Sequence, residues 1–173
     1  MDVGFIGLGK LGLPCALAVE SRGHDVVGYD PSEQVKDIID TRKLQYQEIW
    51  AQDYLDKTKI KIKSIEEVVK HSEIIFVPIQ TPHGEQYEGI TRIPDTREDF
   101  DYTWLVNCIK QISEVLDKIK ENKIVTIIST VLPGTLRKYI FPVMSERINL
   151  SIGCSLSGWL LKTTFPFGSW YPK

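Results

Sequence analysis

The sequence has no long apolar run, no strong excess of charge of one sign and no paired cysteine spacing. None of its apolar stretches approaches the roughly 20 residues that a membrane-spanning helix needs. With 21 basic and 23 acidic side chains, the formal net charge is -2, so bulk charge does not indicate a nucleic-acid or membrane surface. The first residues also lack the basic region and cleavage site of a secretory signal. We therefore expect a cytoplasmic globular protein that binds neither nucleic acid nor membrane.

The three cysteines, Cys15, Cys108 and Cys154, are odd in number and widely spaced. This pattern favours neither a disulfide framework nor a cysteine metal site, and we predict no bound metal. Cys15 and Cys108 fall within predicted helices, so we interpret them as small core residues. At 173 residues the chain is long enough for one domain with a proper core and too short for two of ordinary size.

What the sequence does contain is a glycine-rich turn between an apolar strand and a helix, over residues 2–14. Three glycines follow the strand with the spacing Gly7-x-Gly9-x-x-Gly12. In a dinucleotide-binding turn the first glycine permits the tight bend, the second lets the backbone approach a pyrophosphate, and the third allows close packing of helix on strand. Pro14 suits the first helical turn, where its missing amide has no intrahelical acceptor.

An acidic residue lies at the matching distance downstream. Asp30 ends the predicted strand 24–30, where a carboxylate can accept hydrogen bonds from ribose hydroxyls and repel a 2′-phosphate. The following Pro31 and Ser32 supply no arginine for such a phosphate. The pattern therefore predicts NAD as cofactor, in preference to NADP; the alternative is a glycine turn that serves only packing.

Apolar strands alternate with amphipathic helices along the chain, which is typical of a parallel sheet covered on both faces. We predict an α/β fold, a doubly wound, mostly parallel, Rossmann-like sheet of about six strands with helices on both faces. Residues 1–150 form this domain, and 151–173, which contain no acidic residue, form an atypical tail that is disordered or truncated. The predicted helices cover 11–22, a segment from 31, 46–55, a segment after Ser64, 105–119 and 135–147; strands include 60–63, 74–77 and 124–128.

Two loops after predicted strands carry candidate site residues. Thr81 and Pro82 follow the strand 74–77, and Ser129 and Thr130 follow the strand 124–128. Since the carboxyl ends of parallel strands face one crevice, we expect these loops to lie together beside a ligand. The competing interpretation is that each threonine hydroxyl only satisfies a loop amide or caps a turn.

The polar segment 83–101 is longer than most connections, and such loops are usually functional or disordered. His83 opens it and is a candidate base, although a loop histidine without a visible partner is more often solvated.

Taken together, the stretch 4–14, the loop 80–82 and the segment 129–135 resemble the UDP-glucose and GDP-mannose dehydrogenase family over roughly residues 1–148. That family oxidises the C6 alcohol of a nucleotide sugar to a carboxylate with NAD, through a covalent thioester on a cysteine, in polysaccharide biosynthesis. The resemblance implies that Asp30 binds the adenosine ribose and that Thr130 is a candidate catalytic residue. The cofactor-binding set implied in this way is Gly7, Gly9, Lys10, Leu11, Gly12, Asp30, Thr81, Pro82, Ser129 and Thr130.

The sequence also departs from the family pattern. Where the family has an Asn-Pro-x-Phe segment with an acidic residue, this tail has Phe-Pro-Phe-Gly at 165–168, without an acid. The family's central dimerisation helix and catalytic cysteine domain also have no counterpart in this sequence. Cys154 lies outside any family motif, so we do not expect it to be a nucleophile. We predict that the chain binds NAD without oxidising a sugar by itself. The nucleotide sugar would be bound through a missing C-terminal half. Whether the chain forms a homodimer is left open.

Two alternatives remain at this point. The chain could be a free-standing NAD-binding or sensory module that uses 83–101 to contact a partner. It could also be a fragment of a beta-hydroxyacid dehydrogenase, a class that needs a helical substrate domain and a catalytic lysine.

Overall fold

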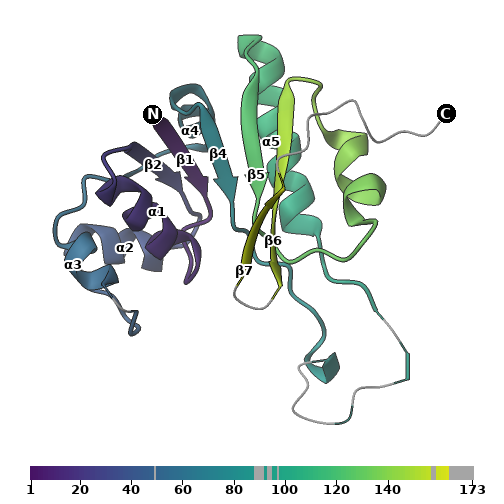
Figure 1. Cartoon of the computed structure of the whole chain (residues 1–173), viewed down its shortest axis with the longest axis horizontal. Coiled ribbons are helices and arrows are strands. Elements are labelled where there is room, and N and C mark those ends of the chain that lie inside the picture. Colours follow the sequence, from purple (N-terminus) through teal and green to yellow (C-terminus); the bar gives the residue numbers. More distant parts are fainter. Residues whose placement is uncertain (49, 88–91, 93–94, 97, 157–158, 164–173) are drawn as a thin grey trace.

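The computed structural model describes residues 1–48, 50–87, 92, 95–96, 98–156 and 159–163, with side chains through residue 152. Its centre is a seven-stranded sheet of order β3-β2-β1-β4-β5-β6-β7, in which the first six strands are parallel and β7 is antiparallel to β6 (Figure 1). The strands are β1 Asp2–Ile6, β2 Asp25–Tyr29, β3 Lys61–Ile62, β4 Ile74–Val77, β5 Lys123–Ile127, β6 Ile148–Leu156 and β7 Trp159–Thr163. The predicted α/β fold with a mostly parallel sheet is confirmed.

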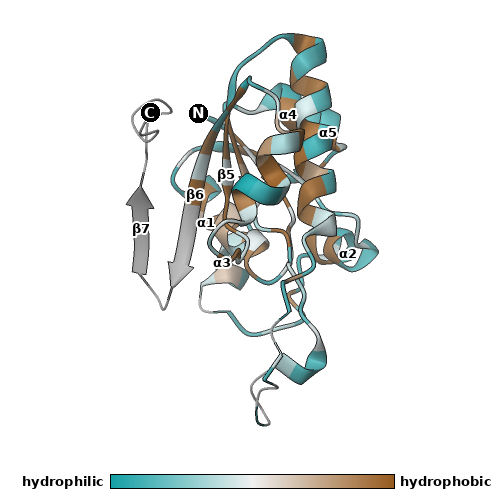
Figure 2. Ribbon diagram, turned by 90° about the vertical axis from the view of Figure 1, so that its right-hand side faces the viewer, coloured by the Kyte–Doolittle hydropathy of each residue, from teal (hydrophilic) through white to brown (hydrophobic). Residues whose placement is uncertain are grey.

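Helices cover both faces of the sheet, and each face has its own hydrophobic core. The α-helices are α1 Gly12–Ser21, α2 Glu33–Thr41, α3 Ala51–Leu55, α4 Ile65–His71 and α5 Thr103–Ile119, and the shorter turns are η1 Glu85–Tyr87, η2 Leu136–Ile140 and η3 Phe141–Val143. One core holds apolar side chains of α1, α2 and α3, and the other holds those of α4 and α5. Apolar and polar bands alternate along α5, as expected of a helix with one buried face (Figure 2).

Local sequence signals explain several element boundaries. Ser64 caps α4: its hydroxyl accepts a hydrogen bond from the Glu67 amide, and the Glu67 side chain returns one to the Ser64 amide. Lys120 adopts the left-handed conformation at the end of α5. The short β3 lies at the sheet edge, as the alternating pattern of 60–63 predicts.

Two predicted helices differ from expectation. Of the described residues in the segment 46–55, only those of α3 are α-helical, because Trp50 directly before it has a φ of 70°, a left-handed conformation incompatible with a right-handed helix. The helix predicted for 135–147 is replaced by the π-helical turn η2 and the 3₁₀ turn η3. Pro142 lies within η3 and lacks the amide that an α-helix would need there.

The predicted boundary at residue 150 falls inside β6, which pairs in parallel with β5 from Lys123↔Ile148 to Ile127↔Ile152. β7 then pairs with β6 in antiparallel register. Residues 164–173 lie outside the described part of the chain, so the division into a domain and a tail stays a prediction. Among the described helices, none combines the length and apolar character that crossing a bilayer requires.

Candidate functional site

A cleft of about 1010 Å³ opens at the carboxyl ends of β1, β4 and β5. Its walls are the glycine turn after β1, the loop after β4 and the loop after β5, which is the position where doubly wound sheets bind ligands. Seven of the sequence-predicted residues line it: Gly9, Lys10, Leu11, Thr81, Pro82, Ser129 and Thr130. Gly7, Gly12 and Asp30 are not among its lining residues.

The three glycines of the turn meet different steric conditions. Gly7 has a φ of 108° and donates its amide to the Tyr29 carbonyl oxygen at 2.8 Å, which ties the turn to β2. A Cβ on Gly12 would collide with the Gly7 carbonyl oxygen. A Cβ on Gly9 would meet no heavy atom within 4 Å, so the open space beside Gly9 belongs to the cleft. A pyrophosphate can therefore approach the backbone at Gly9.

The start of α1 offers free backbone donors to this space. Leu13 donates its amide to the Gly9 carbonyl oxygen at 3.0 Å, but the amides of Lys10 and Leu11 have no acceptor among the described residues. The first turn of α1 holds no acidic side chain, and no side chain caps it. Unpaired amides and the positive end of the helix dipole favour an anion here. These features fit a dinucleotide phosphate.

Asp30, directly after β2, is half-buried and links two backbone segments. Its Oδ2 accepts a hydrogen bond from the Leu8 amide at 2.7 Å, and its Oδ1 accepts one from the Ser32 amide at 2.9 Å. A carboxylate has about four acceptor positions, so capacity remains for ribose hydroxyls. Sequence spacing pointed to Asp30 as a ligand for the ribose, whereas its bond to the glycine turn becomes visible only in the folded chain.

The two strand-end loops contact each other directly. The Thr81 hydroxyl donates to the Thr130 carbonyl oxygen at 2.7 Å, and the buried Ser129 hydroxyl donates to the Val77 carbonyl oxygen at 3.2 Å. The Thr81 and Ser129 hydroxyls therefore hold the two loops in place, while Thr130 has an exposed side chain in the cleft wall.

Tyr102 does not line the cleft, but it contacts the loop after β5 that forms one of its walls. Its side chain is 4% exposed, and its hydroxyl accepts hydrogen bonds from the Leu132 amide at 3.2 Å and the Thr135 hydroxyl at 3.1 Å. Burial raises the pKa of Tyr102. Next to it, hydrogen bonds from Thr103 lower the pKa of Asp101. Tyr102 thus anchors the loop after β5 to the start of α5.

The described nucleophile and base candidates are weak ones. Desolvation raises the pKa of the buried Cys108 thiol to about 12, and burial followed by the charge of Glu48 raises the pKa of Cys15. His83 lines the cleft, but its Nδ1 lies 3.0 Å from the Gly84 carbonyl oxygen and its ring contacts Phe100 edge-on. The Cys154 side chain lies outside the described residues.

A glycine turn with free helix-terminal amides beside the cleft and an acid directly after β2 define a dinucleotide-binding domain. The model for the UDP-glucose/GDP-mannose dehydrogenase family, NAD binding domain, matches residues 1–157, and the chain belongs to this family. The resemblance seen in the sequence and the predicted cofactor NAD are thereby confirmed.

Individual relatives agree with this assignment. UDP-N-acetyl-D-mannosamine dehydrogenase of Pyrococcus horikoshii is 31% identical over 150 residues, covering 80% of this chain and 30% of the relative. GDP-mannose 6-dehydrogenase of Pseudomonas syringae pv. tomato is 25% identical over 151 residues, covering 84% and 32%. The crystal structure of GDP-mannose dehydrogenase from Pseudomonas aeruginosa superposes with a TM-score of 0.75 at 22% identity, covering 88% of this chain and 35% of that one. The chain spans about a third of the length of these relatives.

Proposed function

We propose that this chain supplies the NAD-binding part of a nucleotide-sugar 6-dehydrogenase, which oxidises the C6 alcohol of a sugar nucleotide to a carboxylate. The observation that carries the proposal is the cleft at the ends of β1, β4 and β5, with free amides on one wall and an exposed Thr130 on another. Bound NAD would accept hydride from the sugar. A cytoplasmic location, a homodimer and a role in polysaccharide biosynthesis belong to the same proposal and rest on the family alone.

Each wall of the cleft has its own part in this proposal. Gly7, Gly9 and Gly12 shape the turn, while the amides of Lys10 and Leu11 face the pyrophosphate. Asp30 accepts hydrogen bonds from the adenosine ribose. The nicotinamide end lies against the strand-end loops, with Thr81, Pro82, Ser129 and Thr130.

The chain alone should bind NAD without turnover. Oxidation of an alcohol to an acid needs a nucleophile that holds the aldehyde, a base for the alcohol proton and donors for the developing oxyanion. Among the described cysteines, both thiols are at least half-buried and have raised pKa values. Loss of general acid–base assistance alone costs about 10²–10⁴-fold in rate.

The test compares binding with turnover in the same preparation. Calorimetry should show NAD binding, and NADH absorbance should stay flat with UDP-glucose, UDP-N-acetylated sugars and GDP-mannose in turn. Addition of the C-terminal part of a matching relative, as a separate chain, should give turnover with one of them. NAD binding without any restored turnover would favour a free-standing binding module, and turnover abolished by Cys154→Ala would make this a compact enzyme.

A further inference from the structure

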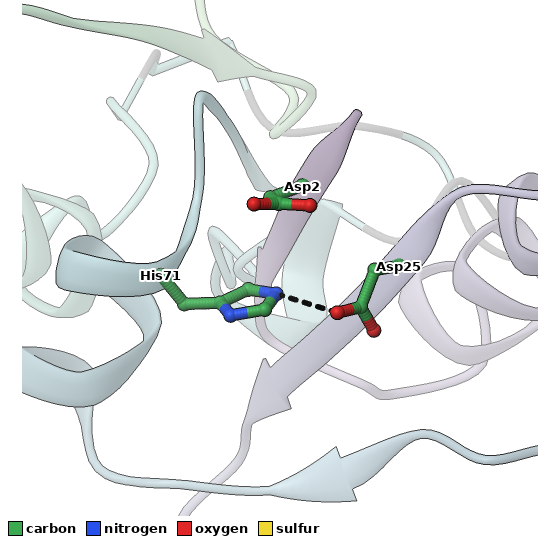
Figure 3. A group of neighbouring side chains, drawn as sticks. All are labelled: Asp2, Asp25 and His71. Carbon is green, nitrogen blue, oxygen red and sulfur yellow. Dashed lines mark ion pairs between the residues drawn. The ribbon is translucent and has the colours of Figure 1, made fainter.

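A cluster of side chains that could bind a metal ion lies at the amino ends of the strands, on the far side of the sheet from the cleft. Asp2 begins β1, Asp25 begins β2 and His71 ends α4 (Figure 3). One ligand atom from each of the three residues lies within 4.8 Å of the other two. Because the glycine turn follows the other end of β1, this cluster is separate from the nucleotide cleft.

Backbone pairing brings the two carboxylates together. Asp2 and Asp25 are directly paired on neighbouring parallel strands, where like charges side by side are unfavourable. Among the described residues, no lysine or arginine forms an ion pair with either carboxylate, and the nearby Lys70 is engaged with Glu66 at 2.6 Å. Binding of a cation would relieve the repulsion between the two carboxylates.

The histidine supplies the independent observation. His71 Nε2 is inaccessible to solvent and has no hydrogen-bond partner, although its side chain as a whole is 22% exposed. This atom forms an ion-pair contact with Asp25, with 3.5 Å between Nε2 and Oδ2, but no hydrogen bond. Figure 3 shows the ring pointing from α4 towards the two carboxylates. A buried ring nitrogen without a hydrogen bond is unfavourable, and an ion held between the ring and the carboxylates would satisfy it.

Packing of α4 on β1 fixes this geometry. Gly4 has no Cβ, and one placed there would lie 2.5 Å from the Ser72 hydroxyl oxygen, so the end of α4 sits directly on the strand. His71 is carried on this rigid contact, whereas the Asp25 side chain is 70% exposed and free to rotate. Small rotations of the carboxylates would place one atom of each side chain about 2.0 to 2.2 Å from a common zinc ion, the usual zinc–ligand distance.

We propose that Asp2, Asp25 and His71 form a binding site for a divalent first-row transition ion such as Zn²⁺. An imidazole nitrogen in the set favours such an ion over Ca²⁺ or Mg²⁺, which prefer oxygen ligands. The exposed carboxylates leave the remaining positions to water. The ion ties the starts of β1 and β2 to the end of α4 and so stabilises the fold, without a part in nucleotide binding.

The test uses the untagged full chain after removal of metal with a chelator. Calorimetry with ZnCl₂ should show one ion per chain, and the melting temperature should rise with ZnCl₂ concentration. His71→Gln and Asp25→Asn should each weaken Zn²⁺ binding by about tenfold or more, and NAD binding should remain unchanged in both. His24→Gln is the matched control, because it removes the neighbouring imidazole and leaves the three ligands.

Several results would overturn the proposal. One is the absence of saturable Zn²⁺ binding, which would leave only a His71–Asp25 ion pair. The others are a Zn²⁺ affinity of His71→Gln equal to that of the wild type, and loss of Zn²⁺ binding in His24→Gln. Titration with Co²⁺ adds a spectroscopic check, since a sulfur-to-metal charge-transfer band would assign the ion to a cysteine. NAD binding by each variant shows that it is folded, so failure here is distinct from failure of the proposed function.

Discussion

The Asp30 carboxylate accepts a hydrogen bond from the Leu8 amide at 2.7 Å, so the end of β2 holds the glycine turn that follows β1. The other carboxylate oxygen is bound by the Ser32 amide at 2.9 Å. One side chain thus holds both the glycine turn and the start of the loop after β2.

Asp30→Asn should weaken NAD binding by about ten- to a hundredfold, the range that corresponds to about 1.5–3 kcal/mol for a hydrogen bond to a charged group. The amide also turns one acceptor into a donor, so either Leu8 or Ser32 loses its partner. Calorimetric titration with NAD and NADP measures both affinity and preference. Asp40→Asn, an exposed acid of α2, is the control for the change in charge. NADP binding as tight as NAD binding in the wild type would contradict the assignment.

Gly9→Ala and Gly12→Ala form a matched pair that separates the binding role from the packing role. A methyl group at Gly9 enters open space, so the fold should survive while NAD binding falls. A methyl group at Gly12 collides with the Gly7 carbonyl oxygen, so the melting temperature should drop. Thermal melts and NAD titrations of both variants decide between these roles. Wild-type NAD affinity in Gly9→Ala would mean that the turn is only structural.

Tyr102→Phe should lower the free energy of unfolding by about 1–3 kcal/mol, because the Leu132 amide and the Thr135 hydroxyl lose a buried partner. Urea unfolding followed by circular dichroism measures the change. Tyr139→Phe is the control, since its hydroxyl is 3.5 Å from an Asp99 oxygen in an exposed position. An equal loss of unfolding free energy in the two variants would show that the buried hydrogen bonds of Tyr102 do not stabilise the fold more than the exposed contact of Tyr139.

Local signals account for the parts of the fold that could be predicted. The glycine turn, the cap at Ser64 and the amphipathic α5 depend on residues within a few positions of one another, so they can be read from the sequence. Thr81 and Thr130 could be placed in one crevice because parallel strands end at the same sheet edge.

Features that depend on distant contacts could not be predicted in this way. The bond from Leu8 to Asp30 joins residues 22 positions apart, and Tyr102 meets Leu132 across 30 positions. The left-handed Trp50, which shortens the helix at 46–55, has no glycine or asparagine to signal it. Such contacts exist only once strand register and helix packing are set.

Cys108 is the described thiol most strongly affected by the fold. Desolvation on α5 raises its pKa from 9.0 to about 12. At neutral pH it stays protonated and inert, which agrees with its expected role as a core residue. The folded chain therefore holds a proton that the unfolded chain releases as the pH rises above 9.0.

This difference predicts the sign of a pH effect on stability. Below pH 9.0 the contribution of Cys108 is fully present, and it is lost as the pH rises towards 12, because the unfolded state then binds fewer protons than the folded state. At neutral pH, the difference in unfolding free energy between Cys108→Ala and the wild type should not depend on pH. At alkaline pH, the unfolding free energy of Cys108→Ala should fall less steeply than that of the wild type. Urea unfolding at several pH values measures both slopes, and Cys15→Ala, which removes a half-buried thiol whose pKa is also raised, should change the alkaline slope in the same direction. Parallel curves for wild type and Cys108→Ala, or rapid alkylation of Cys108 in the folded chain at neutral pH, would show an accessible thiolate and reopen the search for a nucleophile in this chain.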